Sequence, residues 1–438
     1  MSSSPSEAAL FLEKHPQLET IDLLICDLNG IMRGKRVGRE LLSKVFDQGF
    51  YMPGSVMGLD ATGDTVPATL LGLETGDSDN LCKPVAGTLA IVPWCESEVR
   101  AQVLCTMHEL DGSPFFADTR QALCRVVERF SALGYTPGIA LELEFYLIDK
   151  ERDAKGAIQH PRSPSSNRRM SSTQVYSLDD LDDYDFFIRD VLDTARQQGV
   201  PADAVIAENA PGQFEVNLDY GTDIMAAADN AVLLKRLIRQ VARKHDMEAS
   251  FMAKPYIDQP GNGLHIHLSL LDAKGNNIFA EGDVLQNSFM RSAMGGLLDL
   301  ADATQAFICP SVNSFRRLAP DECAPTSKTW GFDNRSVALR IPAAGGKATR
   351  IECRTAGADA NPYLATAAML IGIGEGLLNK TEPSTPVVDN AYSQDHPLLA
   401  DNQRDSLRKM EADPRLGEWL GEDFVRIYGA AKWFDVRL

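Results

Sequence analysis

Two short segments of the sequence carry a pair of identical polar residues at alternate positions. Residues 141–145 read Leu-Glu-Leu-Glu-Phe, and residues 264–268 read Leu-His-Ile-His-Leu. A period of two predicts β-strands, in which both glutamates, or both histidines, leave the same face of the sheet. Two like charges on one buried face repel each other unless solvent or a cation screens them. The chain is therefore expected to build a sheet with one apolar face and one polar face.

Each pair has an interpretation that needs no function. Taken alone, the glutamate pair favours a half-exposed strand with solvated carboxylates. The histidine pair is as consistent with packing as with function, although it follows Pro260-Gly261-Asn262-Gly263, where glycines allow the backbone to come close to a ligand. Only the other polar residues of the sequence can decide between a structural and a functional role for each pair.

Further carboxylates occur in two more segments. Glu208 and Glu215 flank a Pro-Gly turn, and Glu352 lies between two arginines in Arg350-Ile-Glu-Cys-Arg354. Together with the glutamate pair and one histidine of the histidine pair they give five glutamates and one histidine, a donor set that suits Mg²⁺ or Mn²⁺ better than structural zinc. Six ligands indicate two metal ions, an arrangement that neutralises a phosphoryl group during transfer. Cations that could surround such a group follow along the chain, although each alone is also typical of a solvated basic face: Arg317, Arg335, Arg340, Lys347, Arg350 and Arg354.

The order of predicted elements indicates an α+β protein in two unequal parts. Strands over 21–28 and 31–37 dominate the first part, and a turn at Asp111-Gly112 precedes a helix-capping pattern at Asp118. We therefore expect domains over 1–112 and 113–438. In the second part we expect strands over 139–148, 213–218, 264–271, 336–341 and 349–354, and helices over 178–198, 222–246, 285–308 and 360–379.

Composition excludes several classes of protein. A formal charge of −18 over 438 residues argues against nonspecific binding to nucleic acid or to an anionic membrane. No apolar run reaches the length of a membrane span, and the first residues lack the pattern of a signal peptide. Eight scattered cysteines without a CxxC pair indicate reduced thiols. We expect a cytoplasmic protein.

Six blocks in a fixed order resemble the glutamine synthetase family. They are Glu142-x-Glu144, Glu208 through Glu215, 263–269, 313–318, 334–336 and 350–354. The resemblance implies an amino-terminal β-grasp domain and a large carboxy-terminal catalytic domain with a curved, mainly antiparallel sheet. It also implies a homo-oligomer, a dodecamer of two hexameric rings, with active sites between neighbouring subunits.

The resemblance assigns a role to each matching residue. One metal ion is expected at Glu144, Glu208 and Glu215, and a second at Glu142, His265 and Glu352. The contacts to ATP are expected from His267, Ser269, Arg335, Arg340 and Lys347. The glutamate substrate is expected at Gly261, Asn262, Arg317 and Arg354, with Arg317 and Arg335 acting in catalysis.

The chain departs from ammonia-using members of the family at one position. Those members carry a glutamate directly before Ala-Pro in a flap, where this chain has Cys323, with Glu322 one place earlier. Without that carboxylate a site for ammonium is weaker, and there is room for carbon atoms attached to the nitrogen. We therefore expect an alkylamine or a polyamine such as putrescine as the nucleophile. The pattern resembles the γ-glutamylpolyamine ligase branch, used in amine utilisation, and the candidate amine pocket comprises Asp60, Asp64, Glu322, Cys323 and Trp330.

Two alternatives remain. Glu322 could replace the missing flap carboxylate, in which case the chain makes glutamine from ammonia. A catalytically inactive scaffold is a second alternative, although such a protein would be expected to lose metal ligands or arginines, and here all six ligands remain.

Overall fold

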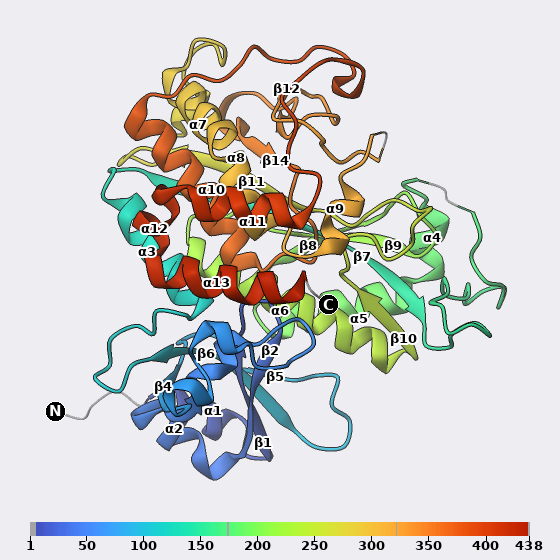
Figure 1. Cartoon of the computed structure of the whole chain (residues 1–438). Helices are drawn as coiled ribbons and strands as arrows, with labels where there is room; N and C mark the ends of the chain where they lie inside the picture. The colour runs from blue at the N-terminus through green and yellow to red at the C-terminus, as the bar shows by residue number, and fades with distance from the viewer. Residues whose placement is uncertain (1–5, 173–174, 321, 437–438) are drawn as a thin grey trace.

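The computed structural model describes residues 6–172, 175–320 and 322–436, and its strands form two sheets. The first sheet lies at the bottom of Figure 1 and the second lies above it, surrounded by helices (Figure 1). The elements up to residue 108 are α1 (Glu7–Lys14), β1 (Thr20–Cys26), β2 (Met32–Gly38), α2 (Leu42–Gln48), β3 (Phe50–Pro53), β4 (Asp79–Pro84), β5 (Ala90–Ile91) and β6 (Arg100–His108). The remaining ones are α3 (Thr119–Ser131), β7 (Thr136–Asp149), α4 (Leu178–Asp183), α5 (Asp185–Gln197), β8 (Ala202–Ala207), β9 (Gln213–Leu218), α6 (Ile224–Lys244), β10 (Met247–Ser250), β11 (Leu264–Leu271), α7 (Ser288–Asp299), α8 (Ala301–Ile308), α9 (Val312–Arg317), β12 (Trp330–Phe332), β13 (Leu339–Ile341), β14 (Ile351–Cys353), α10 (Pro362–Asn379), α11 (Gln403–Ala412), α12 (Pro414–Leu420) and α13 (Glu422–Asp435).

The first sheet has the strand order β2-β1-β6-β4-β3, with β5 paired to β6. β1 and β2 form an antiparallel hairpin that turns at Asn29-Gly30. The Asp27 carboxylate accepts the N–H groups of Asn29 and Ile31 at 2.9 Å, and Gly30 takes φ +73°, a conformation that costs glycine little. β1 and β6 run parallel at the centre of the sheet.

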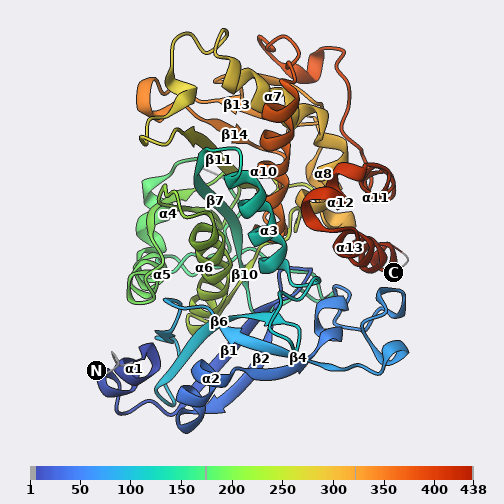
Figure 2. The ribbon, with the colours of Figure 1, turned by 90° about the vertical axis from the view of Figure 1, so that its left-hand side faces the viewer.

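The second sheet has the order β12-β13-β14-β11-β7-β9-β8, with β10 paired to β7. Every pairing in it is antiparallel except β12 with β13. Leu141, Leu143 and Phe145 of β7 are almost fully buried in the hydrophobic core. The views in Figures 1 and 2 place α3, α6 and α10 beside this sheet (Figure 2). The mixed α/β protein therefore presents one face of its second sheet to helices and keeps the other for polar side chains.

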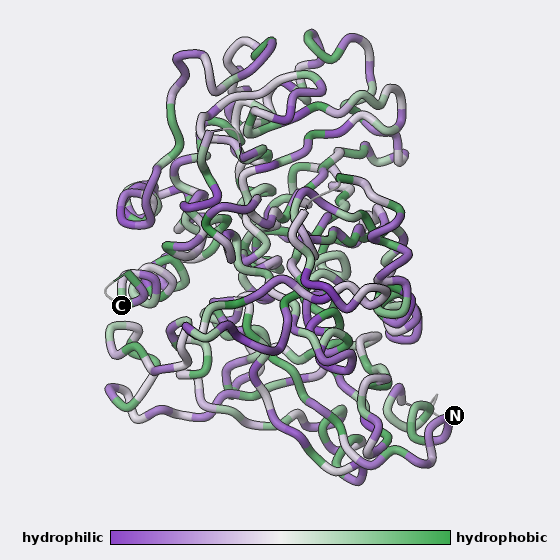
Figure 3. Tube along the Cα trace, turned by 90° about the vertical axis from the view of Figure 1, so that its right-hand side faces the viewer, coloured by the Kyte–Doolittle hydropathy of each residue, from purple (hydrophilic) through white to green (hydrophobic). Residues whose placement is uncertain are grey.

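A single hydrophobic core runs through both parts of the described chain. It contains residues of β1 and β6 as well as residues of α10 and α13. The junction is also polar, since Asn361 donates to the Asp27 carbonyl at 2.9 Å and Thr119 donates to the Cys26 carbonyl at 3.1 Å. Hydrophilic and hydrophobic residues are interspersed in both parts of the described chain (Figure 3). None of the helices in the described ranges combines the length and apolar character that a membrane crossing requires.

Two predicted helices are interrupted in the structure. The helix expected over 178–198 is α4 followed by α5, because Tyr184 leaves helical geometry with φ −103° and ψ 14°. The helix expected over 285–308 is α7 followed by α8, with Leu300 between them. Both prediction errors have the same reason, since the apolar residues continue with helical spacing across each break. The strands expected over 336–341 and 349–354 shorten to three residues each in β13 and β14.

Candidate active site

The polar face of the second sheet gathers five of the six predicted metal ligands, all except Glu208, by strand register. Glu142 of β7 lies opposite His265 of β11, and Glu144 lies opposite Glu215 of β9. His267 in turn lies opposite Glu352 of β14. Residues directly opposite in an antiparallel pair share a face, as do residues two apart on one strand. Four neighbouring strands therefore present a continuous row of carboxylates and imidazoles.

Two groups in this row are close enough to hold a metal ion. Ligand atoms of Glu142, His265 and Glu352 lie within 4.8 Å of one another, and so do those of Glu144, Glu215 and His265. His265 is shared, with its Nδ1 3.2 Å from Glu142 Oε2 and its Nε2 3.8 Å from Glu144 Oε1. Glu208 lines the same cavity but lies outside both groups.

Negative charge is in excess at the β9 end of the row. Burial, together with the charges of Glu142, Glu144 and Glu208, raises the pKa of Glu215 to about 9. Burial and the Glu144 charge raise the pKa of Glu208 to about 7. Buried carboxylates that repel one another in this way are neutralised by a proton or by a cation. The oxygen-rich donor set suits a hard divalent cation, so the residues present fit the expected metal ions.

Glu142, in contrast, is held in its ionised form. Burial opposes its ionisation, but hydrogen bonds from His265 and His267 outweigh burial and hold the pKa of this carboxyl well below its usual range. His267 Nε2 lies 2.8 Å from Glu142 Oε1, and Arg350 Nε donates to His267 Nδ1 at 3.1 Å. Glu142 is consequently a fixed negative charge at the centre of the row.

Arginines border the carboxylates on the β13 side. Arg340 donates to Glu352 at 2.7 Å, and Arg354 contacts the other oxygen of the same carboxylate. Arg317 is buried, and it donates to the carbonyls of Thr355 and Arg354 at 3.0 and 3.1 Å. Arg335 is exposed. All four arginines line a cavity of about 190 Å³ together with the metal-ligand candidates, which we call the central cavity.

The glycine-rich segment before β11 gives the central cavity its shape. A Cβ atom at Gly263 would lie 2.8 Å from Arg317 Nη2 and 2.9 Å from His265 Nε2. The Gly263 N–H donates to Glu144 Oε2 at 2.7 Å, which orients that carboxylate. Gly261 lines the cavity. Asn262 is fully buried: its side chain donates to the carbonyls of Ser250 and Met252, and its backbone N–H donates to the Ala253 carbonyl.

A second cavity, which we call the Ser269 cavity, adjoins the central cavity at Glu142. It has a volume of about 710 Å³ and is lined by His267, Ser269 and Lys347 of the expected ATP contacts. The other two expected contacts, Arg335 and Arg340, lie on the opposite side, in the central cavity. The predicted ATP contacts thus fall into two groups that meet at Glu142.

The flap that departs from the ammonia-using pattern lies at the edge of the central cavity. Cys323 is exposed, takes φ +54°, and its carbonyl accepts from Arg354 at 3.3 Å. The Glu322 carboxylate pairs with Lys254 at 2.6 Å, and the lysine side chain is only 3% exposed. The Tyr392 hydroxyl donates to the Ala324 carbonyl at 3.0 Å. The flap is therefore tied down on both sides of Cys323.

The remaining candidates for the amine pocket are not at this site. The predicted place of Trp330 in the amine pocket is corrected, because this side chain is fully buried in β12 and its indole N–H donates to the Ser384 carbonyl at 2.6 Å. Asp60 and Asp64 lie in the amino-terminal part, where Asp60 accepts the N–H of Asp64 at 2.8 Å. Neither acid lines the central cavity of its own chain, as far as the described residues define it.

Several residues at the site escaped prediction from the sequence. Lys254 is a buried lysine. The only sequence feature that could have marked it as a site residue is its position shortly before the glycine-rich segment. Tyr220 bonds to the Ser269 hydroxyl at 2.9 Å, and Asn277 donates to the Lys347 carbonyl at 3.0 Å. Neither stands in a recognisable motif.

The fold and this site define an α+β protein whose main sheet carries a carboxylate-rich face able to bind metal ions. A model of the glutamine synthetase catalytic domain matches residues 116–438. The chain belongs to the glutamine synthetase family of carbon–nitrogen ligases.

Two curated relatives and one solved structure are similar over nearly the whole chain. The γ-glutamylputrescine synthetase PuuA of Escherichia coli (strain K12) is 39% identical, covering 98% of this chain and 91% of that protein. The glutamate–isopropylamine ligase of a Pseudomonas species is 34% identical, with 98% and 93% covered. The GmaS/ADP complex in conformation 1 superposes with a TM-score of 0.84 at 28% identity, with 99% and 97% covered.

Proposed function

We propose that this chain is an ATP-dependent ligase that joins the γ-carboxylate of L-glutamate to an alkylamine or polyamine. The two similar relatives are named for putrescine and isopropylamine ligation. A γ-carboxylate oxygen attacks the γ-phosphorus of ATP, the bond to ADP breaks, and γ-glutamyl phosphate forms. The amine nitrogen then attacks the acyl carbon, inorganic phosphate leaves, and the nitrogen loses a proton.

The proposed metal ligands follow the two groups on the sheet. Glu142, His265 and Glu352 would hold one divalent ion, and Glu144 and Glu215 with Glu208 would hold another. Mg²⁺ or Mn²⁺ bound there would neutralise charge on the transferring phosphoryl group. The raised pKa values of Glu208 and Glu215 support this part of the proposal, because burial and repulsion among the glutamates outweigh the positive charge of Arg335 beside Glu208.

The proposed substrate positions follow the cavities. The nucleotide would occupy the Ser269 cavity, where His267, Ser269 and Lys347 contact it, and its terminal phosphate would reach Glu142. Arg335 and Arg340 would stabilise the phosphoryl charge from the central cavity. Arg317 and Arg354, with the backbone of Gly261 and Asn262, would bind glutamate. The GmaS/ADP complex supports a nucleotide in this fold.

One observation carries the choice of an amine over ammonia. Glu322, which could have replaced the missing flap carboxylate, is paired with the buried Lys254 at 2.6 Å. Removing Glu322 from that pair would leave a buried cation without a partner, which is costly. Among the described flap residues, the carboxylate that lines the central cavity, that of Glu322, is thus committed to Lys254, and Cys323 offers a small, uncharged wall.

The experiment measures phosphate release with purified protein, glutamate, ATP and Mg²⁺ or Mn²⁺ while the amine is varied. We expect release to need an amine, and kcat/KM to be higher for ethylamine or putrescine than for ammonium. Glu144→Ala should abolish release and retain the folded circular dichroism spectrum. Best efficiency with ammonium would favour an ammonia-using glutamine synthetase, and no release with any acceptor would favour the inactive scaffold.

Further parts of the proposal rest on the family resemblance. We propose a domain boundary near residue 112 and an amino-terminal β-grasp domain, supported by a mixed sheet with β1 parallel to β6 at its centre. We also propose a homo-oligomer of two hexameric rings, in which Asp60 and Asp64 of a neighbouring subunit face the amine. A cytoplasmic location is supported by eight cysteines that are all free thiols.

A further inference from the structure

A third cavity opens beside the flap. It has a volume of about 700 Å³, and its described lining comes from the flap and from segments 332–336 and 386–392. We call it the Tyr392 cavity. Two of its lining residues, Cys323 and Arg335, also line the central cavity. The two cavities therefore adjoin each other beside the flap.

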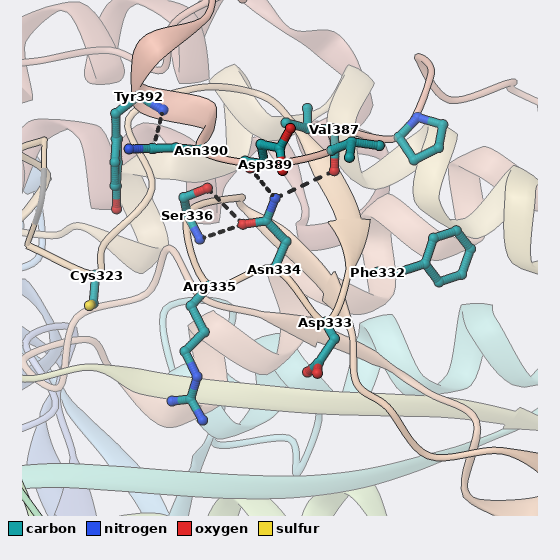
Figure 4. Close-up of a pocket in the computed structure, with 12 residues that line it drawn as sticks. Cys323, Phe332, Asp333, Asn334, Arg335, Ser336, Val387, Asp389, Asn390 and Tyr392 are labelled. Atoms are coloured by element: carbon teal, nitrogen blue, oxygen red, sulfur yellow. Dashed lines mark hydrogen bonds between the residues drawn. The ribbon is translucent and has the colours of Figure 1, made fainter.

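The walls of the Tyr392 cavity are held in place by hydrogen bonds. The Asn334 amide donates to the carbonyls of Val387 and Asp389 at 3.4 and 2.8 Å, and its oxygen accepts from Ser336 (Figure 4). The Tyr392 hydroxyl holds the flap at Ala324. Three separate segments of the chain are thereby tied together around one space, so the cavity is a built feature of the fold.

The lining combines apolar surface with two acidic groups, and the Arg335 guanidinium lies where this cavity meets the central cavity. Phe332, Val387 and Val388 contribute hydrocarbon, and Val388 is 72% exposed. Asp333 and Asp389 contribute carboxylates. Asp333 pairs with Arg340 at 2.6 Å, whereas the Asp389 carboxylate has no partner within the described part of the chain. Apolar walls with one uncommitted negative charge match an aliphatic chain that carries a distal ammonium group.

The small volume of the central cavity also indicates that a long amine needs space outside it. Its volume of about 190 Å³ already has to accept glutamate and the proposed metal ions. The Ser269 cavity is assigned to the nucleotide. The Tyr392 cavity is the remaining space continuous with Cys323, where the proposed amine attacks.

We propose that the Tyr392 cavity binds the distal part of the amine substrate, with carbon atoms against Phe332 and Val388 and a second ammonium group at Asp389. This inference rests on the proposed function and adds the substrate class to it, namely a diamine longer than ethylamine. The cavity then makes the ligase selective for the length of the amine's carbon chain and for a second ammonium group.

The first test changes the shape of the cavity. Val388→Trp fills it from an exposed position, and Leu398→Trp, which is 66% exposed and lies outside all three cavities, is the matched control. The measured quantity is kcat/KM for putrescine divided by kcat/KM for ethylamine. We expect this ratio to fall by about tenfold in Val388→Trp and to stay unchanged in Leu398→Trp.

The second test changes charge without changing shape. Asp389 has φ +67°, a conformation that asparagine also tolerates, so Asp389→Asn keeps the backbone unstrained. The ratio of putrescine to butylamine efficiency isolates the distal ammonium, since both amines have four carbons. We expect up to about a fivefold fall, the size of a partly exposed ion pair. The exposed Asp395 lies outside the cavity, and Asp395→Asn serves as the control.

The outcomes separate this inference from the proposed function. Wild-type turnover with unchanged ratios in both variants overturns the assignment of the cavity and leaves the ligase proposal standing. An equal loss for all amines in Val388→Trp also overturns it, because the cavity would then be a route for glutamate. If the wild type ligates no amine, the proposed function itself fails, and the assignment fails with it.

Discussion

At the scale of single residues, selectivity depends on where one carboxylate lies. Glu322 and Cys323 are neighbours in the flap, yet Glu322 is bound by the buried Lys254 and Cys323 faces both the central and the Tyr392 cavities. Both residues line the central cavity, but the Lys254 ammonium group compensates the Glu322 charge, so Cys323 presents an uncharged side chain where a carboxylate is missing.

Returning the carboxylate should restore a preference for ammonium. We expect Cys323→Glu to raise kcat/KM for ammonium relative to ethylamine by about tenfold, because the new charge compensates ammonium and its bulk opposes carbon. Cys323→Gln has the same size and the same backbone strain without the charge. Equal effects of the two substitutions on this ratio would refute the electrostatic explanation.

The raised pKa of Glu215 predicts how metal-free stability depends on pH. The pKa is about 9 in the folded protein and about 4.3 for a glutamate in an unfolded chain. Between these values the folded state holds the extra proton, so the stability contributed by Glu215 is complete below about pH 4.3 and is lost as pH rises through 9.

The measurement is a thermal melt in EDTA across this window. Since Gln cannot ionise, the Tm of the wild type should fall by several degrees relative to that of Glu215→Gln between pH 5 and 9. Mg²⁺ or Mn²⁺ should raise the Tm of the wild type most at the upper end. A difference between the two proteins that does not vary with pH would show that Glu215 is not strained by its neighbours.

At the scale of elements, strand register places most of the site. The sequence alone predicts that Glu142 and Glu144 share a face, and likewise His265 and His267, because period two is local. It cannot predict that β11 pairs with β7 in the register that sets His265 against Glu142. That register depends on contacts between residues more than a hundred positions apart. The family resemblance supplied this information, whereas Trp330 was misplaced because a motif does not reveal which side of a strand is buried.

The glycine-rich approach to β11 is the element most sensitive to a single added atom. In Gly263→Ala the new Cβ would meet Arg317 and His265, and the Arg317 guanidinium cannot retreat easily because backbone carbonyls hold it. We expect at least about a tenfold loss of kcat/KM for glutamate and weaker metal binding in a folded protein. Gly221→Ala is the control, since nothing lies within 4 Å of its added atom. Similar activity of the two variants would contradict the tight packing at Gly263.

At the scale of the whole molecule, three cavities surround one point on the second sheet. The Ser269 cavity meets the central cavity at Glu142, and the Tyr392 cavity meets it at Cys323 and Arg335. Under the proposed assignments, nucleotide and amine would reach the central cavity from separate cavities. The amino-terminal sheet shares the hydrophobic core with the catalytic part, but Asp60 and Asp64 lie outside the three cavities of their own chain. The net charge of −18 agrees with a cationic amine as substrate and is not specific evidence for one.

The central claim, that the chain ligates an amine in preference to ammonia, is tested most directly by competition in one tube. Equal concentrations of ammonium and putrescine are supplied with glutamate, ATP and Mg²⁺ or Mn²⁺, and both products are quantified by mass spectrometry. The ratio of γ-glutamylputrescine to glutamine then equals the ratio of the two kcat/KM values. We predict at least about a tenfold excess of γ-glutamylputrescine. An excess of glutamine would contradict the account.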